Sequence, residues 1–498
     1  MWSRQQCEAY LNQVFHIPGF HDDQWEIIQK ILMGKRVLAI QRTGFGKSLC
    51  YQFPSLFFPG ITLVLSPLIA LMRDQVRQLQ ELKLPVGAIN SQQYPGTNRY
   101  ILKLATTGKL KLLYLAPERI HSRQWLKNLD NLQISFIAID EAHCISVWGH
   151  DFRPDYRRLV ELTTERFPQV PTLAMSASLT SSAINDIKNQ IGENMEINRG
   201  PLVRSNIALN VISIKDESER WCRLGMLVKN NPPPGIIYCG TRERTEQAAQ
   251  WLRTIGISAE FYHAGLPKQE RQTRETRFFK NEISCLTATN ALGMGINKSN
   301  LRYIIHAQMP GSLMEYYQEI GRAGRDGQPA SAVLFFHEQD RHIREFFINT
   351  HRPHIKYYQQ ILTELNHTGF SIQDFARKCQ LDDSMVKRIL VDLMEQNIVK
   401  KNDIPYPPLF KMNLDPEWFD YDRVEEIRIC QFDELIKIMR YIELKTCRMN
   451  YICSYLGQEI TIPCGICDQE KKTDQKLRGW ESMVKTYQTY TTQISKKL

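Results

Sequence analysis

The chain has 498 residues, enough for about three domains, and its 43% hydrophobic and 23% charged residues are typical of a globular protein with sizeable cores. With 26 Gly and 23 Pro it is not low-complexity or collagenous, and its net charge of +10 is compatible with a polyanionic partner without establishing one. No apolar run of about 18 residues predicts a membrane span, and residues 1–8 lack the apolar core of a secretory signal, so we expect a cytoplasmic protein with mostly reduced cysteines.

Short β-branched runs, each followed by a helical stretch, recur through the first 345 residues. In the first half they are residues 36–40, 61–65, 111–115, 135–139 and 171–175. After a Pro-rich turn the pattern restarts at 235–239, 257–263, 284–289, 301–309 and 331–336. Such runs with helices between them predict parallel strands buried on both faces. We therefore expect an α/β protein with two tandem parallel-sheet domains, over 1–205 and 206–345.

The pattern changes after about residue 345. Residues 355–365, 371–379 and 384–396 predict three helices, and apolar-basic segments that follow predict a two-stranded wing. This favours a winged-helix-like domain over 346–412, with a generic three-helix bundle as the alternative. Two further helices are expected within 417–457. Residues 471–498 contain seven Lys and Arg against two acids, so a basic tail over 473–498 is expected to be a disordered arm that contacts phosphates.

A glycine-rich segment at residues 43–48 lies between a predicted strand and a predicted helix. It begins with Thr43 and contains Gly44 and Gly46, which let backbone N–H groups approach phosphates at a helix N-terminus. Lys47 is then expected to reach the β and γ phosphates of a nucleotide, and Ser48 to bind Mg²⁺. The bare pattern often occurs by chance, but this strand–loop–helix setting favours a phosphate loop.

Asp140 and Glu141 directly follow the predicted strand at 135–139. Two carboxylates at the end of a buried strand are costly without a cation. We expect Asp140 to lie near Mg²⁺ and Glu141 to orient or deprotonate the attacking water. The alternative, an acidic pair at a helix N-terminus, is disfavoured by the phosphate loop upstream.

Arg322 and Arg325 lie three residues apart at a Gly-punctuated turn of the second domain. They either form a solvated face or reach a site on the first domain, where an arginine can stabilise the charge on a transferring phosphoryl group.

These motifs, in this order, resemble the RecQ family of superfamily 2 helicases over about residues 10–345. The matching segments are FHIPGF at 15–20 with Gln24, SPLIALMRDQ at 66–75, APER at 116–119, DEAHCIS at 140–146, WGHDFRP at 148–154, YHAGL at 262–266, GMGINK at 293–298 and QEIGRAGRDG at 318–327. The resemblance implies two RecA-like domains and ATP-driven, 3′-to-5′ unwinding of DNA in recombination, repair or replication. It also implies that Gln24 reads adenine.

Further roles implied by the resemblance fall in two groups. Catalysis is assigned to Lys47, Asp140, Glu141, His143, Gln318, Arg322 and Arg325, and DNA contact to Trp148, Phe152 and Arg153. Aromatic and Arg side chains beside the catalytic carboxylates can stack on bases, although Trp148 and Phe152 could instead be core aromatics.

Three positions depart from the family pattern. Phe45 stands where a Gly is usual, His21 where an Arg is usual, and 176–178 reads Ser-Ala-Ser in place of Thr-Ala-Thr. None of these predicts a dead ATPase, because both loop glycines and both hydroxyls remain.

Cys447, Cys464 and Cys467 resemble the family's zinc element, which we place over 413–472 and expect to bind Zn²⁺. Glu470 stands where the family has a fourth Cys, and structural zinc takes four ligands. Glu470 or Asp468 could supply an oxygen, Cys453 could substitute, or the site could be empty.

The domain order also departs, because the winged-helix-like segment precedes the cysteines and no helical accessory domain follows them. The chain therefore resembles a short or divergent RecQ. Lys387 and Arg388 on the third helix, with Lys400 and Lys401 on the wing, are candidate duplex contacts, although a solvated face explains them as well.

The expected partners are single-stranded and duplex DNA, and single-strand-binding or repair proteins, with no membrane. We expect a bacterial, nucleoid-associated monomer. Three other functions remain open: a DNA-stimulated translocase without strong strand separation, a non-catalytic DNA-binding scaffold, and an RNA helicase. The catalytic residues argue against a scaffold, and the aromatic-rich segment after Glu141 argues against RNA.

Overall fold

A computed structural model describes residues 2–146, 152–292, 298–402, 407–471 and 480–495. The chain divides into two compact units. The first comprises Met1–Pro310, Met314–Phe335 and Leu444–Leu498, and the second comprises Gly311–Leu313 and Phe336–Glu443. Among the described helices, none is long and apolar enough to cross a membrane.

The first unit begins with a seven-stranded sheet in which every neighbouring pair of strands is parallel. Its strand order is β3-β4-β2-β5-β6-β1-β7. The strands are β1 (Arg36–Ile40), β2 (Ile61–Leu65), β3 (Val86–Ile89), β4 (Leu112–Leu115), β5 (Ile134–Ile139), β6 (Thr172–Ser176) and β7 (Glu196–Arg199). The parallel sheet predicted for this region is therefore confirmed, with β3 and β7 added to the expected strands.

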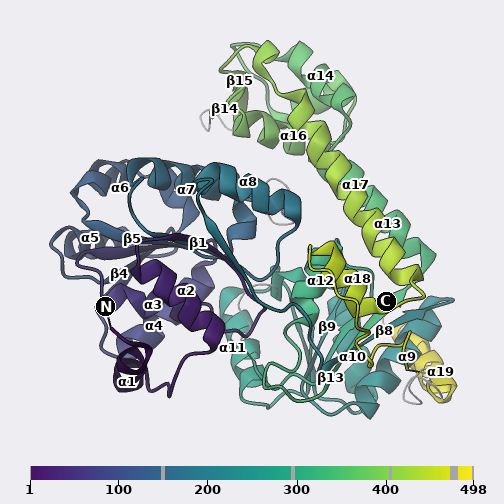
Figure 1. Cartoon of the computed structure of the whole chain (residues 1–498). Helices are drawn as coiled ribbons and strands as arrows, with labels where there is room; N and C mark the ends of the chain where they lie inside the picture. The colour runs from purple at the N-terminus through teal and green to yellow at the C-terminus, as the bar shows by residue number, and fades with distance from the viewer. Residues whose placement is uncertain (1, 147–151, 293–297, 403–406, 472–479, 496–498) are drawn as a thin grey trace. The chain divides into compact units, whose positions relative to one another are not determined.

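Helices cover both faces of this sheet (Figure 1). One face carries α1 (Arg4–Phe15), α2 (Asp22–Leu32), α3 (Leu49–Gln52) and α4 (Ile69–Glu81). The other carries α5 (Pro95–Thr106), α6 (Arg123–Asn128), α7 (Pro154–Arg166) and α8 (Ser181–Ile191). Successive residues of β1 alternate between these cores: Val37 packs with α1–α4, and Leu38 packs with α5–α8.

A six-stranded sheet in the order β10-β11-β9-β12-β13-β8 forms the second half of this unit. Its strands are β8 (Ile207–Ser213), β9 (Gly235–Tyr238), β10 (Ala259–Tyr262), β11 (Cys285–Ala288), β12 (Tyr303–His306) and β13 (Ala330–Phe336). The helices between them are α9 (Glu217–Asn230), α10 (Arg242–Thr254), α11 (Lys268–Phe279) and α12 (Leu313–Ile320). Residues 200–206 form the linker that joins the two sheets.

The end of the chain returns to this unit as α18 (Arg448–Tyr455), a short helix η8 (Trp480–Met483) and α19 (Val484–Ser495). Tyr487 and Tyr490, three residues apart on α19, pack against Trp251 of α10 with ring centroids 5.2 and 5.4 Å away. The Arg223 guanidinium lies 5.0 Å from the centre of the Trp480 ring. The described part of the tail thus differs from the disordered arm expected from its charge, because its aromatic residues share one helical face.

The second unit contains α13 (Glu338–His351), α14 (Ile355–Glu364), α15 (Ile372–Cys379), α16 (Asp383–Glu395) and α17 (Tyr421–Glu443), with α13 and α17 side by side (Figure 1). An antiparallel pair, β14 (Val399–Asn402) and β15 (Leu409–Met412), follows α16. Three helices and a strand pair are therefore present where they were expected, and the winged-helix interpretation stays a prediction. The expected 413–472 segment is divided after Glu443, because α17 packs in this unit and α18 in the first.

Candidate functional site

The strand order brings three loops of the first sheet together. β5, β6 and β1 are neighbours and parallel, so the loops that follow them lie at one edge of the sheet. These loops are the phosphate loop after β1, the Asp140–Glu141 pair after β5, and residues 176–178 at the end of β6. Polar groups at the carboxyl ends of adjacent parallel strands are typical of ligand sites in α/β proteins.

The phosphate loop depends on its two glycines and on Gln24. Gly44 and Gly46 have φ angles of +85° and +83°, which side chains rarely allow. The Gln24 amide donates a hydrogen bond of 2.8 Å to the Phe45 carbonyl, and its oxygen accepts from the His21 backbone N–H at 2.9 Å. The Phe45 ring packs toward His21, with centroids 6.4 Å apart, and against the core under α2. His21 and Phe45, two of the three positions that depart from the family pattern, therefore contact each other.

Lys47, Asp140 and Glu141 form the charged centre of the site. Lys47 Nζ donates a hydrogen bond of 3.0 Å to the Gln41 carbonyl, and burial lowers the pKa of Lys47, which the charges of Glu141 and Asp140 partly oppose. Asp140 is 7% exposed, and burial followed by the adjacent Glu141 raises the pKa of its carboxyl to about 7. Two acids and one lysine are thus held close together where a cation would stabilise the carboxylates.

Glu141 adopts an unusual backbone conformation, with φ at +48°. A non-glycine residue in the left-handed region is strained, and such strain is common at functional sites. One Glu141 carboxylate oxygen lies 3.4 Å from His143 Nδ1. The same nitrogen lies 3.3 Å from the Ser176 hydroxyl, and the Ser178 hydroxyl donates to the Met314 sulfur of α12. Both hydroxyls of the Ser-Ala-Ser segment therefore keep polar contacts.

Arg322 and Arg325 lie on the turn that follows α12. A Cβ built on Gly44 would be 3.4 Å from Arg325 Cγ, so Arg325 lies against the phosphate loop. Burial, followed by the charges of Arg322 and Arg204, lowers the pKa of Arg325 to about 10, and Glu141 partly opposes this. Arg322 Nε and Gln318 Nε2 are buried without a hydrogen-bond partner among the described residues. Clustered guanidinium groups and unpaired donors fit an anionic ligand.

Arg204, in the linker between the sheets, is a site residue that the sequence analysis missed. It is 5% exposed and donates hydrogen bonds to three carbonyl groups of the turn that carries Arg322 and Arg325. An isolated Arg before a β-branched strand carries no motif, so no sequence signal distinguishes it from a surface residue.

The aromatic segment proposed to contact DNA is only partly described. Trp148 lies outside the described residues. Arg153 Nη1 donates to the Pro67 carbonyl at 2.7 Å, which ties the segment to the loop after β2. The Tyr156 hydroxyl lies 2.8 Å from the Leu65 carbonyl and 2.6 Å from that of Asp140. These hydrogen bonds connect Arg153 and Tyr156 to the ends of β2 and β5, so a displacement of either residue would change the contacts at those strand ends.

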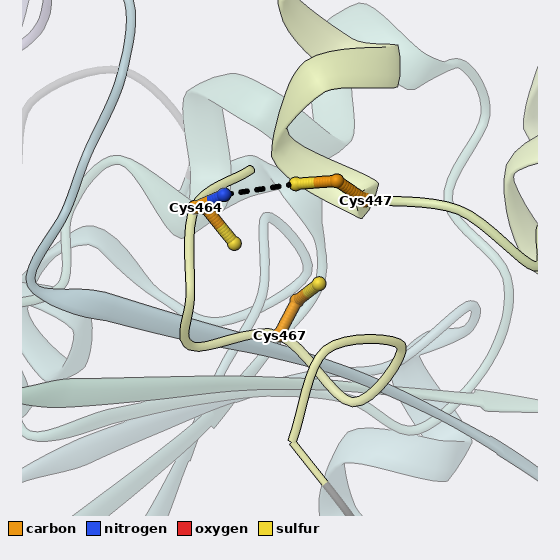
Figure 2. A group of neighbouring side chains, drawn as sticks. All are labelled: Cys447, Cys464 and Cys467. Carbon is orange, nitrogen blue, oxygen red and sulfur yellow. Dashed lines mark hydrogen bonds between the residues drawn. The ribbon is translucent and has the colours of Figure 1, made fainter. Parts of the chain in front are cut away.

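The three predicted metal-ligand cysteines meet in the first unit. Cys447 caps the start of α18, and Cys464 and Cys467 lie on the loop that follows it, with their sulfurs within 4.8 Å of one another. Figure 2 shows these sulfur atoms directed toward one another, and the Cys464 N–H donating to Cys447 Sγ at 3.3 Å. Burial raises the pKa of the Cys464 thiol to about 12, so a bound cation would be needed to hold thiolates there.

The structure separates the candidates for a fourth ligand. Asp468 pairs with the buried Arg448 at 2.5 Å and accepts a hydrogen bond from the Val211 N–H. Cys453 is buried in α18 and is not part of the cluster. Glu470 is exposed, and its carboxylate accepts a hydrogen bond of 3.0 Å from the N–H of Gly465, between the two loop cysteines. Glu470, like Cys453, is not part of the three-sulfur cluster, but its hydrogen bond to Gly465 places it closer to the loop cysteines in its contacts than Asp468, whose carboxylate is engaged by Arg448 and Val211.

The candidate duplex contacts lie in the second unit. Lys387 is exposed on α16, whereas Arg388 is half-buried with Nη2 3.9 Å from the Asp392 carboxylate. Lys400 and Lys401 are exposed on β14. Asp392 also pairs with Arg352 and accepts from the Tyr358 hydroxyl, both at 2.5 Å.

Comparison with known proteins identifies both sheets. The family model for DEAD/DEAH box helicases matches residues 21–187, and that for the helicase conserved C-terminal domain matches residues 218–327. A solved structure of the DUF1998 helicase MrfA bound to DNA has a TM-score of 0.57 at 18% identity and covers 84% of this chain and 63% of that one. That likeness shows the fold.

Two curated proteins show the level of sequence similarity. The ATP-dependent DNA helicase RecQ of Pasteurella multocida is 42% identical over 68% of this chain and 53% of its own length. The probable ATP-dependent DNA helicase RecS of Bacillus subtilis is 39% identical over 78% of this chain and 75% of its own length. This chain spans about half the length of the first RecQ relatives that it matches.

Proposed function

The chain belongs to the RecQ family of superfamily 2 helicases, and on that premise we propose that it is an ATP-dependent helicase that unwinds duplex DNA in the 3′-to-5′ direction. The observation that carries the proposal is the meeting of Lys47, Asp140, Glu141 and Arg325 at one edge of the first sheet. Positioned charges of this kind are what phosphoryl transfer requires of a protein, because most of its catalysis is electrostatic.

ATP is the substrate of this site. The phosphate loop holds the phosphates with its backbone N–H groups, and Lys47 contacts the β and γ phosphates. Glu141 orients the attacking water and receives its proton, since its carboxylate lies beside Asp140 and Lys47. Arg322 and Arg325 stabilise the charge that develops on the transferring phosphoryl group. Gln24, which holds the phosphate loop through Phe45, contacts the adenine.

The Asp140–Glu141 pair fits a divalent cation. Two neighbouring carboxylates, one of them buried with a raised pKa, are stabilised by a positive charge, and Ser48 lies at the N-cap of α3, directly after Lys47 in the chain. We propose that Ser48 and Asp140 hold Mg²⁺, which when bound neutralises phosphate charge.

The cysteine cluster fits zinc. We propose that Cys447, Cys464 and Cys467 bind Zn²⁺ with Glu470 as the fourth ligand, which when bound holds α18 to the loop after it. Three sulfurs within 4.8 Å of one another and an oxygen held at Gly465 support this assignment.

DNA is the proposed macromolecular partner. Phe152 and Arg153 contact the single strand and couple it to hydrolysis through the ends of β2 and β5. Lys387 contacts duplex phosphates. We propose that the protein acts as a monomer at the nucleoid in recombination, repair or replication, with single-strand-binding or repair proteins.

Strand displacement tests the proposal. Matched duplexes carrying a 3′ or a 5′ single-stranded tail are incubated with the full chain, ATP and Mg²⁺, with Lys47→Ala as the control. We expect displacement from the 3′ tail only, and none with Lys47→Ala. Displacement from the 5′ tail would overturn the polarity. DNA-stimulated ATP hydrolysis without displacement would replace the helicase with a translocase.

A further inference from the structure

The turn at residues 321–328 is held by an ion pair between Arg302 and Asp326 and also by side chains of the linker between the two sheets. Arg204 donates from Nη1 to the Gly321 carbonyl at 2.9 Å and from Nη2 to those of Ala323 and Gly324 at 2.7 and 3.1 Å. Asn206 Nδ2 donates to the carbonyls of Gly324 and Gln328 at 2.8 and 2.9 Å. Two linker residues thus hold four carbonyl groups of one turn.

Arg204 is buried without an opposite charge. It is 5% exposed, burial lowers its pKa, and the neighbouring Arg42 lowers it further. Among the described residues, no carboxylate forms an ion pair with it. Burying a guanidinium without a carboxylate partner is costly, and here its planar, fixed donors bind three carbonyl groups of the turn.

The turn needs such support because its own charges repel. Burial, followed by the charges of Arg322 and Arg204, disfavours the positive charge of Arg325, which lies against the phosphate loop. Gly324 has a φ of +53°, and a Cβ built there would lie 2.5 Å from Asn206 Nδ2, so the turn backbone rests directly on the linker. The Gly321 carbonyl also accepts from the Thr43 hydroxyl of the phosphate loop at 2.9 Å.

The linker is itself anchored at its other end. Arg199 Nη1 donates to the carbonyls of Leu456 and Gly457, and the Leu202 N–H donates to the Gln458 side chain at 2.9 Å. The Tyr317 hydroxyl of α12 donates to the Leu202 carbonyl at 2.8 Å. The linker that contacts the turn is therefore itself held in place by residues 456–458, which directly follow α18.

We propose that Arg204 and Asn206 are positioning residues for ATP hydrolysis: they hold the turn so that Arg322 and Arg325 face the phosphates. This rests on the proposed function. In this role they contact neither the nucleotide nor DNA, and they affect hydrolysis only by fixing the positions of Arg322 and Arg325. A misplacement of about 1 Å at a catalytic group can cost roughly 100-fold in rate.

The test measures steady-state ATP hydrolysis with single-stranded DNA for the full-length chain. In Arg204→Gln we expect kcat to fall roughly 10- to 100-fold with little change in KM for ATP. Arg204→Lys should be intermediate, because a lysine reaches fewer of the three carbonyls. The matched control is Arg36→Gln: Arg36 also donates to two carbonyls, those of Ile191 and Pro168, at the opposite end of β1 from the phosphate loop. The variant Arg36→Gln should therefore have the same kcat as the unchanged chain.

A mutant cycle separates positioning from general destabilisation. If Arg204 acts through the turn, Arg204→Gln adds little to the loss of kcat in a chain that already carries Arg322→Gln and Arg325→Gln, whereas an unrelated structural effect would multiply with that loss. Should Arg204→Gln fail to fold, Asn206→Ala, which removes the bonds to Gly324 and Gln328, provides the same comparison.

The outcomes distinguish this inference from the proposed function. A wild-type chain without ATP turnover overturns both. A wild-type chain with turnover, but with kcat in Arg204→Gln and Asn206→Ala equal to that of Arg36→Gln, overturns only the positioning role. A multiplicative effect of Arg204→Gln in the chain that lacks both Arg322 and Arg325 also overturns it.

Discussion

Two buried charged clusters in the molecule are built in opposite ways. In the second unit, Arg352 and the Tyr358 hydroxyl both meet the carboxylate of Asp392, which is 3% exposed. In the first unit, Arg204 is just as buried but bonds only to carbonyl oxygens, and it lies near Arg322 and Arg325. The first cluster therefore pairs its buried arginine with a carboxylate, whereas no carboxylate among the described residues forms an ion pair with Arg204.

The difference separates a structural role from a functional one. A buried ion pair with its hydrogen bonds satisfied needs nothing more, and breaking it costs stability. A group of neighbouring guanidinium groups is stabilised by an anion from outside, and a polyphosphate supplies one. Mutations around Asp392 should therefore mainly lower stability, whereas mutations around Arg325 should mainly lower the rate of ATP hydrolysis.

The largest expected effect comes from Arg325→Ala in the first unit. We expect kcat for DNA-stimulated ATP hydrolysis to fall on the order of 10³-fold, because an arginine in this role acts on the transition state. Thermal stability should hold or rise, since the change removes a buried charge beside Arg322 and Arg204. Kinetics and thermal unfolding on the same preparation check both parts. A clear drop in stability with unchanged kcat would reverse the assignment of the two clusters.

The next effect is expected from Asp392→Asn in the second unit. It leaves Arg352 buried without its negative partner, and we expect a local loss of about 3 kcal/mol. Hydrogen exchange should show lower protection in α14 and α16, with that of the first sheet unchanged. Lys378→Ala is the control, because its ion pair with Glu364 is partly exposed to solvent and should contribute little. Equal protection in the two variants would contradict the prediction.

The smallest effect is expected from two neighbouring basic residues of α16. Lys387 is exposed, so Lys387→Ala should weaken duplex binding modestly and reduce the slope of log affinity against log salt by about 1. Arg388 is directed to Asp392, so Arg388→Ala should lower protection of α16 and leave the salt slope nearly unchanged. Fluorescence anisotropy with labelled duplex over a salt series measures the slopes. Equal slopes would mean that Arg388 also contacts phosphates.

Sequence patterns predicted the buried strands well and the edge strands poorly. β2 and β5 are apolar runs that contain one hydroxyl residue each, Thr62 and Ser135, because both faces of a central parallel strand are covered. β7 at the sheet edge is Glu-Ile-Asn-Arg and has no such signature. β3 has only four residues and includes Gly87, so it was missed as well.

The same contrast holds for the candidate site. Lys47 and Asp140 belong to short motifs whose residue types are dictated by phosphate and metal chemistry, so their proximity could be expected. Arg204 acts through carbonyl groups more than a hundred residues away in the chain, and backbone acceptors leave no trace in the sequence. Long-range contacts to the backbone are thus the part of a site that a single sequence conceals.

The helix α19 packs against α9 and α10, two helices beside the second sheet, and it is synthesised long after them. Its Tyr490 hydroxyl reaches the Gln247 carbonyl, 243 residues earlier in the chain. At a synthesis rate of 5–20 residues per second, this gap corresponds to roughly 10 to 50 seconds of translation. During that time α10 has emerged and Trp251 still lacks its tyrosine partners. The newly made chain therefore carries an aromatic surface that a chaperone or another unfinished chain can contact before its own last helix arrives.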